Sequence, residues 1–306
     1  MKVAFAGTPD FAATILRALI SSHHDVALVI SQPDPRRGRG RKATPTPVAD
    51  LAHAANLPLL QPARISEAAP EISDFDALVV AAYGQILRPD TLYATRTGAW
   101  NVHASLLPKY RGAAPIERAI MNGEPQTGVT IVRMDEGLDT GPIALKRPVE
   151  IPPDMTGGEL SELLSHLGAK AIVEVLSSVE RGTVTLTHQD NVNATYASKL
   201  TSEEAVIRWH LPARQVHDLV RALSPHIGAR TFHPEVRGPV KLWRAKILQG
   251  KDPSLEAGRI YGENGRLIVG CGTGALQVLE LQMPGARRLS TQDFLRGNTL
   301  YGAFRV

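Results

Sequence analysis

The sequence predicts a two-part α/β protein, in which a doubly wound, mostly parallel sheet is followed by a small β-barrel. The 306 residues exceed one comfortable core, because chains divide into domains near ~250–300 residues. The first half alternates short apolar runs with amphipathic segments, whereas the last third carries short strands separated by turns. Hydrophobic residues at 43% and charged residues at 21% are ordinary globular usage, which excludes a disordered chain, a collagen and a coiled coil.

In the first half, apolar runs predict buried strands, and apolar residues at helical spacing predict the helices between them. From Asp10 to Leu19 the chain has apolar residues at the i, i+3, i+4, i+7 spacing of an amphipathic helix. Strand–helix alternation of this kind builds a parallel sheet with helices on both faces. The expected strands are residues 3–6, 26–30, 77–82, 99–103 and 129–134.

The pattern changes after residue 183. A capping box at Thr156–Glu159 opens the last helix of the first half, and a polar stretch then begins at Thr187, which we interpret as a linker. The predicted division is a first domain over residues 1–186, a linker over 187–204 and a second domain over 205–306.

Short strands dominate the second domain after one helix that starts at Leu211-Pro212. Asn264-Gly265 between two of the strands is a hairpin signal. Several short strands within fewer than about 80 residues are typical of a small barrel such as the OB type. The expected strands are residues 240–248, 259–261, 266–271 and 275–281.

Net charge is +4, but it is unevenly distributed. Residues 1–200 hold 19 Lys and Arg against 21 Asp and Glu, a balance of −2, whereas residues 201–306 hold 15 against 9, a balance of +6. A basic C-terminal third predicts a polyanionic partner, because phosphates attract Lys and Arg at long range. The alternative is a soluble domain that is basic without such a partner.

The composition also predicts the compartment. No apolar run reaches the ~18–20 residues of a membrane helix, and the short apolar run after Lys2 stops at Gly7, unlike a signal peptide. Cys271 is the only cysteine in the sequence, which excludes an intrachain disulfide and a thiolate metal cluster. We expect a cytoplasmic protein without a membrane partner and, by default, a monomer.

Asn101-Val102-His103 ends one of the predicted parallel strands. Because side chains alternate along a strand, Asn101 and His103 share a face, close to the carboxyl edge where open sheets bind ligands. An Asn amide can donate to an oxygen that develops negative charge, and a His can transfer a proton near neutral pH. The commoner alternative is two polar residues satisfied by loop backbone.

An acidic, glycine-containing turn, residues 135–141, follows the last of these strands. One of its carboxylates, Asp135, Glu136 or Asp139, could orient the His and stabilise its charged form. An ordinary Asx turn is the alternative. The sequence contains no HExxH, GxSxG, CxxC, Walker or GxGxxG motif, so metal, hydrolytic and nucleotide-cofactor chemistry gain no support from motifs.

A basic segment follows the second predicted strand. Five of the seven residues 36–42 are basic, namely Arg36, Arg37, Arg39, Arg41 and Lys42. Such a loop cannot bury itself, and its position at the same sheet edge makes a phosphate backbone a plausible partner. A solvated charged loop is the alternative.

Along most of its length the sequence resembles the methionyl-tRNA formyltransferases. The Asn-x-His, Ser-Leu-Leu-Pro and Asp-Thr-Gly elements together are specific for folate-dependent formyltransferases, and the basic insert and linker motif narrow the resemblance to the tRNA enzymes. The insert departs slightly, because Pro35-Arg36-Arg37 stands where a Pro-Ala-type pair is more usual. The matching segments are Phe5–Phe11, Gln32–Asp34, Ala81–Leu87, Asn101–Pro108, Tyr110–Ile116, Thr127–Ile131, Met134–Gly141 and Thr195–Lys199.

The resemblance implies a Rossmann-like formyltransferase domain followed by an OB-like tRNA-binding barrel. It implies 10-formyltetrahydrofolate as donor, the α-amino group of methionyl-initiator tRNA as acceptor, and no metal. By motif, the catalytic group is Asn101, His103 and Asp139, and Arg39 matches the position that engages the acceptor stem. The implied folate contacts are Ser105, Leu106, Leu107 and Pro108.

Two alternatives remain. A sugar-nucleotide N-formyltransferase shares the catalytic group, but a small acceptor needs no basic arm for RNA. A tRNA-binding protein without activity would be favoured if Asn101, His103 or Asp139 were replaced, and all three are present.

Overall fold

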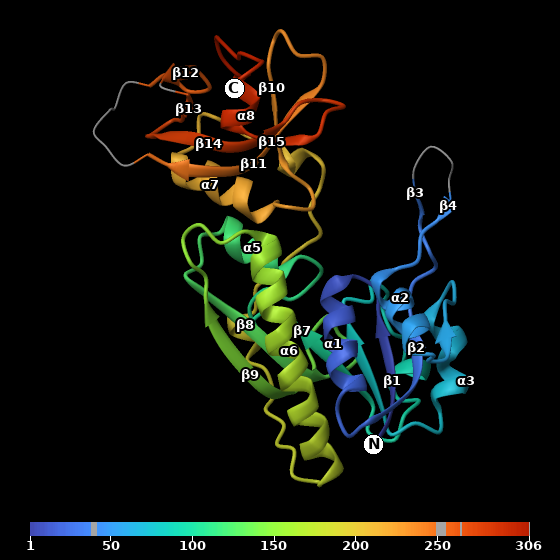
Figure 1. Cartoon of the computed structure of the whole chain (residues 1–306). Helices are drawn as coiled ribbons and strands as arrows, with labels where there is room; N and C mark the ends of the chain where they lie inside the picture. The colour runs from blue at the N-terminus through green and yellow to red at the C-terminus, as the bar shows by residue number, and fades with distance from the viewer. Residues whose placement is uncertain (38–41, 249–254, 264, 306) are drawn as a thin grey trace. The chain divides into compact units, whose positions relative to one another are not determined.

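The computed structural model describes residues 1–37, 42–248, 255–263 and 265–305 (Figure 1). Contacts divide the chain into two compact units. Unit 1 comprises Met1–Pro115, Gln126–Glu150 and Ser161–Ser198, and unit 2 comprises Ile116–Pro125, Ile151–Leu160 and Lys199–Val306. The boundaries drawn from composition, at residues 186 and 204, stay a prediction.

Unit 1 is built on a seven-stranded sheet with the order β5-β2-β1-β6-β7-β8-β9. The pairs from β5 to β7 are parallel, whereas β8 pairs antiparallel with both β7 and β9. This confirms the predicted, mostly parallel sheet. The strands are β1 (Lys2–Gly7), β2 (Asp25–Ile30), β5 (Leu59–Leu60), β6 (Ala77–Ala81), β7 (Ala99–His103), β8 (Gln126–Arg133) and β9 (Ile143–Glu150). A separate two-stranded hairpin consists of β3 (Arg36–Arg37) and β4 (Lys42–Ala43).

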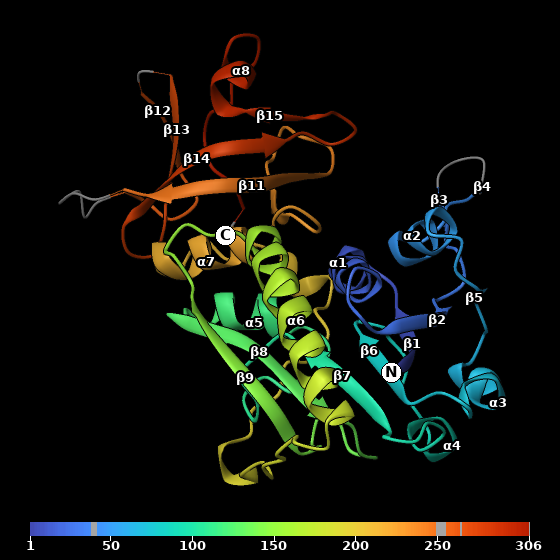
Figure 2. The same ribbon diagram turned by 60° about the horizontal axis from the view of Figure 1, so that its bottom comes forward.

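Helices cover both faces of the parallel part of this sheet, with α1 and α2 on one side and α3 and α4 on the other (Figure 2). Every residue of β6 is buried. Neither face of this strand meets water, because helices cover both faces of the sheet there. On the α3 and α4 side, Ala4 and Leu78 share a core cluster with Ile72. The helices are α1 (Asp10–Ile20), α2 (Pro47–Ala54), α3 (Ala69–Ile72), α4 (Pro89–Leu92), α5 (Pro115–Met121) and α6 (Gly157–Glu180).

The long helix α6 starts in unit 2 and continues in unit 1. Its predicted capping box is confirmed, because the Thr156 N–H donates to Glu159 Oε2 at 2.8 Å and the Glu159 N–H donates to Thr156 Oγ1 at 3.3 Å. Further along, Gly168 lies so close to β7 that an added Cβ would stand 2.7 Å from Val102 Cγ1. Val102 therefore faces α6, and its neighbours Asn101 and His103 face the opposite side of the sheet.

Unit 2 contains a six-stranded antiparallel sheet with the order β10-β11-β14-β13-β12, in which β15 also pairs with β14. Its core includes Trp209, which stacks on Phe304 at a centroid distance of 5.6 Å. The predicted second domain of short strands is thereby confirmed, although Asn264 of the expected hairpin lies outside the described residues. The elements are α7 (Ala213–Ala222), β10 (Ala229–Phe232), β11 (Pro239–Ile247), β12 (Ile260–Glu263), β13 (Arg266–Gly270), β14 (Ala275–Gln282), β15 (Arg288–Ser290) and α8 (Thr291–Leu295).

Short 3₁₀ helices span Ile65–Ala68, Asn191–Asn193 and Glu203–Ala205. Within the described part of the chain, no helix is long and apolar enough to cross a membrane.

Candidate active site

The structure brings together Asn101, His103 and Asp139 in unit 1. Asn101 and His103 lie two residues apart on β7, and Asp139 lies in the loop between β8 and β9. Asn101 Nδ2 donates to Asp139 Oδ1 at 3.3 Å, and His103 Nδ1 lies 3.6 Å from Asp139 Oδ2. The His103 side chain is 6% exposed and the Asp139 side chain 13%, so the two groups interact largely out of water.

The hydrogen bonds of His103 determine which of its nitrogens carries a proton. Nε2 lies 2.8 Å from the Tyr110 carbonyl oxygen, which can only accept, so Nε2 is the donor. In the neutral ring Nδ1 is then unprotonated, and it is this atom that faces Asp139. If Nδ1 takes up a proton, the charged imidazolium ring forms an ion pair with the Asp139 carboxylate at the observed distance.

The Asp139 loop is held in an unusual conformation. Asp139 has φ +53°, a left-handed conformation that costs a non-glycine residue of order 1–3 kcal/mol. Its Oδ2 accepts a hydrogen bond of 2.7 Å from the Gly112 N–H. Asp135, another carboxylate of the turn, instead accepts from Thr140 Oγ1 at 2.6 Å and from the Gly137 N–H at 3.1 Å. Of the three carboxylates left open by the sequence, Asp139 is therefore the one bonded to the Asn101 and His103 pair.

The segment after β7, predicted to contact folate, turns two of its four side chains inward. Ser105 is completely buried and its Oγ donates to the Lys109 carbonyl at 2.6 Å. Leu107 is also completely buried, in a cluster with Val132 and Ile143. Leu106 and Pro108 keep partial exposure. Of the four residues, only Leu106 and Pro108 are therefore accessible to a ligand in this structure.

The sequence did not single out Gly112 or Gln189, which also bond to the Asp139 loop. Nor did it single out Arg111, which bonds to Gln189. Gly112 has φ +114°, and an added Cβ would stand 2.9 Å from the Ala197 carbonyl oxygen. The positive φ and the close approach both require glycine here. The only sequence signal was the glycine in the Tyr110–Ile116 segment.

A second polar network, also missed, lies after β2 and β6. Gln32 Nε2 donates to the Tyr83 carbonyl at 3.1 Å, and Gln85 Nε2 to Gln32 Oε1 at 3.3 Å. The Tyr83 hydroxyl is buried without a hydrogen-bond partner among the described residues. Burial, aided by the negative charge of Glu67, raises the pKa of Tyr83 to about 12, so its hydroxyl keeps its proton and can donate at neutral pH.

The described ends of the predicted RNA-binding segment lie in the strands β3 and β4, which project from the parallel sheet (Figure 1). Arg36 pairs with Ala43 and Arg37 with Lys42 along its backbone. Arg39 and Arg41 lie outside the described residues.

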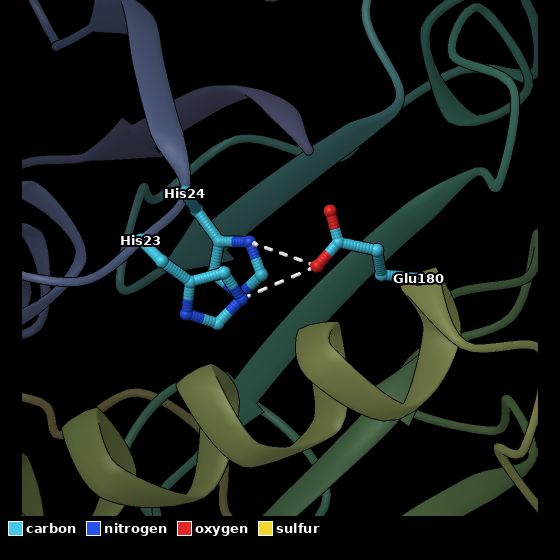
Figure 3. A group of neighbouring side chains, drawn as sticks. All are labelled: His23, His24 and Glu180. Atoms are coloured by element: carbon cyan, nitrogen blue, oxygen red, sulfur yellow. Dashed lines mark hydrogen bonds and ion pairs between the residues drawn. The ribbon is translucent and has the colours of Figure 1, made fainter.

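One group of side chains has the spacing of metal ligands among the described residues, and it lies away from this site. His23, His24 and Glu180 bring potential ligand atoms within 4.8 Å of one another (Figure 3). His23 and His24 precede the amino end of β2, at the sheet edge opposite the loops that follow β6 and β7. The Met1 amine already donates to Glu180 Oε1 at 2.9 Å, and burial, with the charges of His23 and the amine, lowers the pKa of His24. This cluster ties the first residues of the chain to the end of α6.

Comparisons with known proteins identify the family of the chain. Residues 1–176 match the family described as formyl transferase, and residues 199–299 match the formyl transferase C-terminal domain. A methionyl-tRNA formyltransferase of Rubrobacter xylanophilus is 64% identical over 305 residues, covering 100% of both chains. One of Pelotomaculum thermopropionicum is 45% identical, covering 98% of this chain and 96% of that one.

Solved structures give the same fold at low identity. An N-formyltransferase of Helicobacter canadensis, in complex with folinic acid and dTDP-3-aminofucose, is 17% identical with a TM-score of 0.68, covering 94% of this chain and 100% of that one. HypX of Aquifex aeolicus in complex with tetrahydrofolic acid is 16% identical with a TM-score of 0.70, covering 100% of this chain and 51% of that one. The family matches and the full-length identity together decide the assignment: the chain belongs to the formyl transferase family and, within it, to the methionyl-tRNA formyltransferases.

Proposed function

We propose that this protein transfers the formyl group of 10-formyltetrahydrofolate to the α-amino group of methionyl-initiator tRNA, giving formylmethionyl-tRNA for translation initiation. The observation that carries the proposal is the convergence of Asn101, His103 and Asp139. The full-length relatives named methionyl-tRNA formyltransferase support the choice of acceptor.

Asn101 stabilises the charge that develops on the formyl oxygen. Attack of an amine on the formyl carbon turns a carbonyl oxygen into an oxyanion, and a preorganised amide donor lowers the energy of that state. The second hydrogen of Asn101 Nδ2 is available for this, because the first is directed at Asp139 Oδ1.

His103 Nδ1 accepts the proton that the attacking amine must lose. The bond from the amine nitrogen to the formyl carbon forms, the bond from that carbon to the folate nitrogen breaks, and the proton returns to the departing nitrogen. Asp139 forms an ion pair with the protonated ring during this sequence. No step requires a metal.

The remaining assignments follow the family resemblance of each segment. Leu106 and Pro108 contact the folate, and the buried Ser105 and Leu107 position the segment that carries them. Arg36, Arg37, Arg39, Arg41 and Lys42 contact phosphates of the acceptor end. We further propose that the protein acts as a cytoplasmic monomer.

The test is transfer of a labelled formyl group from 10-formyltetrahydrofolate, with methionyl-initiator and methionyl-elongator tRNA offered in parallel. The proposal expects labelling of the initiator species alone. Labelling of neither would refute the acceptor, and amino-sugar nucleotides would be offered next, because a structural neighbour carries dTDP-3-aminofucose.

A further inference from the structure

Gln189 connects a buried arginine to the backbone of the Asp139 loop. Its Nε2 donates to two carbonyl oxygens, those of Asp139 and Gly141, each at 2.8 Å. Its Oε1 accepts from Arg111 Nε at 3.2 Å and from the Arg111 terminal nitrogen at 2.8 Å. All four residues belong to unit 1.

The chemistry of these partners fixes the orientation of the Gln189 amide. A guanidinium has only donors and a backbone carbonyl only accepts, so the flipped amide would face like groups on both sides. Arg111 is 2% exposed, and its terminal nitrogen also donates to Asn191 Oδ1 at 2.8 Å. Its backbone is fixed as well, because the Arg111 N–H donates to the Thr195 carbonyl and the Ala197 N–H donates to the Arg111 carbonyl.

The Asp139 loop needs such an anchor. Asp139 is held at φ +53°, a conformation that persists only when surrounding contacts determine it. Arg111 and Gly112 are neighbours in the chain, and they hold Asp139 from two directions. Gly112 holds the carboxylate through its N–H, and Arg111 holds the backbone carbonyl through Gln189. The carboxylate that faces Asn101 and His103 thus depends on both.

We propose that Gln189 is a positioning residue for formyl transfer, which keeps the Asp139 carboxylate in register with Asn101 and His103 by anchoring the Asp139 and Gly141 carbonyls to Arg111. The proposal rests on the proposed function above. It assigns a role in the reaction to the start of the segment that the sequence suggested was only a linker.

Gln189→Glu separates positioning from simple burial of Arg111. The carboxylate keeps the length of the side chain and pairs with Arg111, but it cannot donate to the two carbonyls. One of its oxygens would instead face the carbonyl oxygens of Asp139 and Gly141, which also only accept. Gln189→Met removes both interactions at similar volume. His188→Ala is the matched control, because His188 is the exposed neighbour on the same segment.

Steady-state formylation of methionyl-initiator tRNA should show kcat of Gln189→Glu reduced by about 10–100-fold. KM for both substrates should change less than about threefold, and Tm should remain within a few degrees of wild type. Gln189→Met, assayed per folded enzyme, should show the same loss, and His188→Ala none. A Gln189→Glu enzyme with wild-type kcat, or one impaired only in KM, would overturn the proposal.

Hydrogen exchange provides a readout that does not depend on activity. Peptides covering residues 133–143 should exchange faster in Gln189→Glu than in wild type, and unchanged protection there would also overturn the inference. An inactive wild-type enzyme, by contrast, would refute the proposed function while exchange still decided whether Gln189 anchors the loop.

Discussion

Backbone strain at single residues is concentrated on the loops around the proposed site. Four non-glycine residues among those described have positive φ, and three of them, Ala82, Tyr110 and Asp139, lie on the loops that follow β6, β7 and β8. Tyr110 supplies the carbonyl that binds His103, and Asp139 supplies the carboxylate. Strain of this kind persists only where the surrounding structure determines it, and here it coincides with the loops that carry the partners of His103.

Cys271, in unit 2, is expected to be chemically inert. The side chain is buried, and burial raises the pKa of its thiol to about 12, so at pH 8 almost no reactive thiolate exists. Iodoacetamide at pH 8 should leave native Cys271 unmodified over hours, as read by mass spectrometry, while the urea-unfolded chain is alkylated. Rapid labelling of the native protein would contradict its buried position.

At the residue scale, the sequence predicted those parts of the site that lie on regular structure. The shared orientation of Asn101 and His103 could be predicted, because residues two apart on a strand point to the same face. The acidic turn left three carboxylates open, and the contacts of Asp139 with Asn101 and His103 decide among them. Gln189 could not be predicted from the residues alone, because a glutamine in a polar stretch has no periodic signal and its role arises only when that stretch packs on the Asp139 loop.

At the element scale, buried parallel strands were the easiest to predict, since β1, β2 and β6 are short, mostly apolar runs. The strand β9 (Ile143–Glu150) was not predicted from the sequence. It alternates partly buried and exposed residues and contains Pro148, which argues against a central strand. Pro148 is tolerated in this strand because β9 is the edge of the sheet and pairs only with β8.

Helix α7 carries a buried ionic group that stabilises unit 2. Asp218 Oδ1 lies 2.7 Å from Arg221 Nε, with both side chains at most 4% exposed, and Asp218 Oδ2 lies 2.9 Å from Arg214 Nε. Asp218→Asn leaves Arg221 buried without its counter-charge, which should cost about 1–3 kcal/mol in urea unfolding followed by tryptophan fluorescence. Glu256→Gln, which weakens an exposed ion pair with Arg259, is the control and should change stability by less than about 0.5 kcal/mol.

The pH dependence of that difference follows from the charge of Asp218. Burial alone would raise the pKa of Asp218, but hydrogen bonds to His217 and Arg221 and the charges of Arg221 and Arg214 lower it below the ordinary 3.8. A lowered folded-state pKa contributes stability that is present above the unfolded value and lost as pH falls through the folded value. The difference in unfolding free energy between wild type and Asp218→Asn should therefore be constant between about pH 5 and pH 8 and shrink below pH 3.8. A marked change in this difference above pH 5 would argue for another titrating group.

At the scale of the whole molecule, composition predicted two parts but not which segments build them. Unit 2 also takes in Ile116–Pro125 and Ile151–Leu160 from the first half of the chain. Such insertions leave no mark in composition, because they are defined by long-range contacts. The charge asymmetry, by contrast, is visible in the sequence, with +6 over residues 201–306 against −2 over residues 1–200.

That asymmetry predicts how the protein binds tRNA. If the basic C-terminal third and the β3–β4 hairpin contact phosphates, binding releases counterions and weakens with added salt. Affinity for methionyl-initiator tRNA, measured by filter binding, should fall roughly tenfold or more between 50 and 200 mM KCl, while KM for the folate donor changes little. Affinity for tRNA that is independent of salt would contradict a phosphate-contacting surface.

If Asn101, His103 and Asp139 together carry out formyl transfer, the replacement Asn101→Ala must slow the chemical step. The measurement is the single-turnover rate of Asn101→Ala with saturating donor and methionyl-initiator tRNA. Loss of one oxyanion donor should lower that rate by roughly 10²–10³, with Tm near that of wild type because the Asn101 side chain is only partly buried. A thermally stable Asn101→Ala enzyme that transfers formyl groups at the wild-type rate would contradict the account.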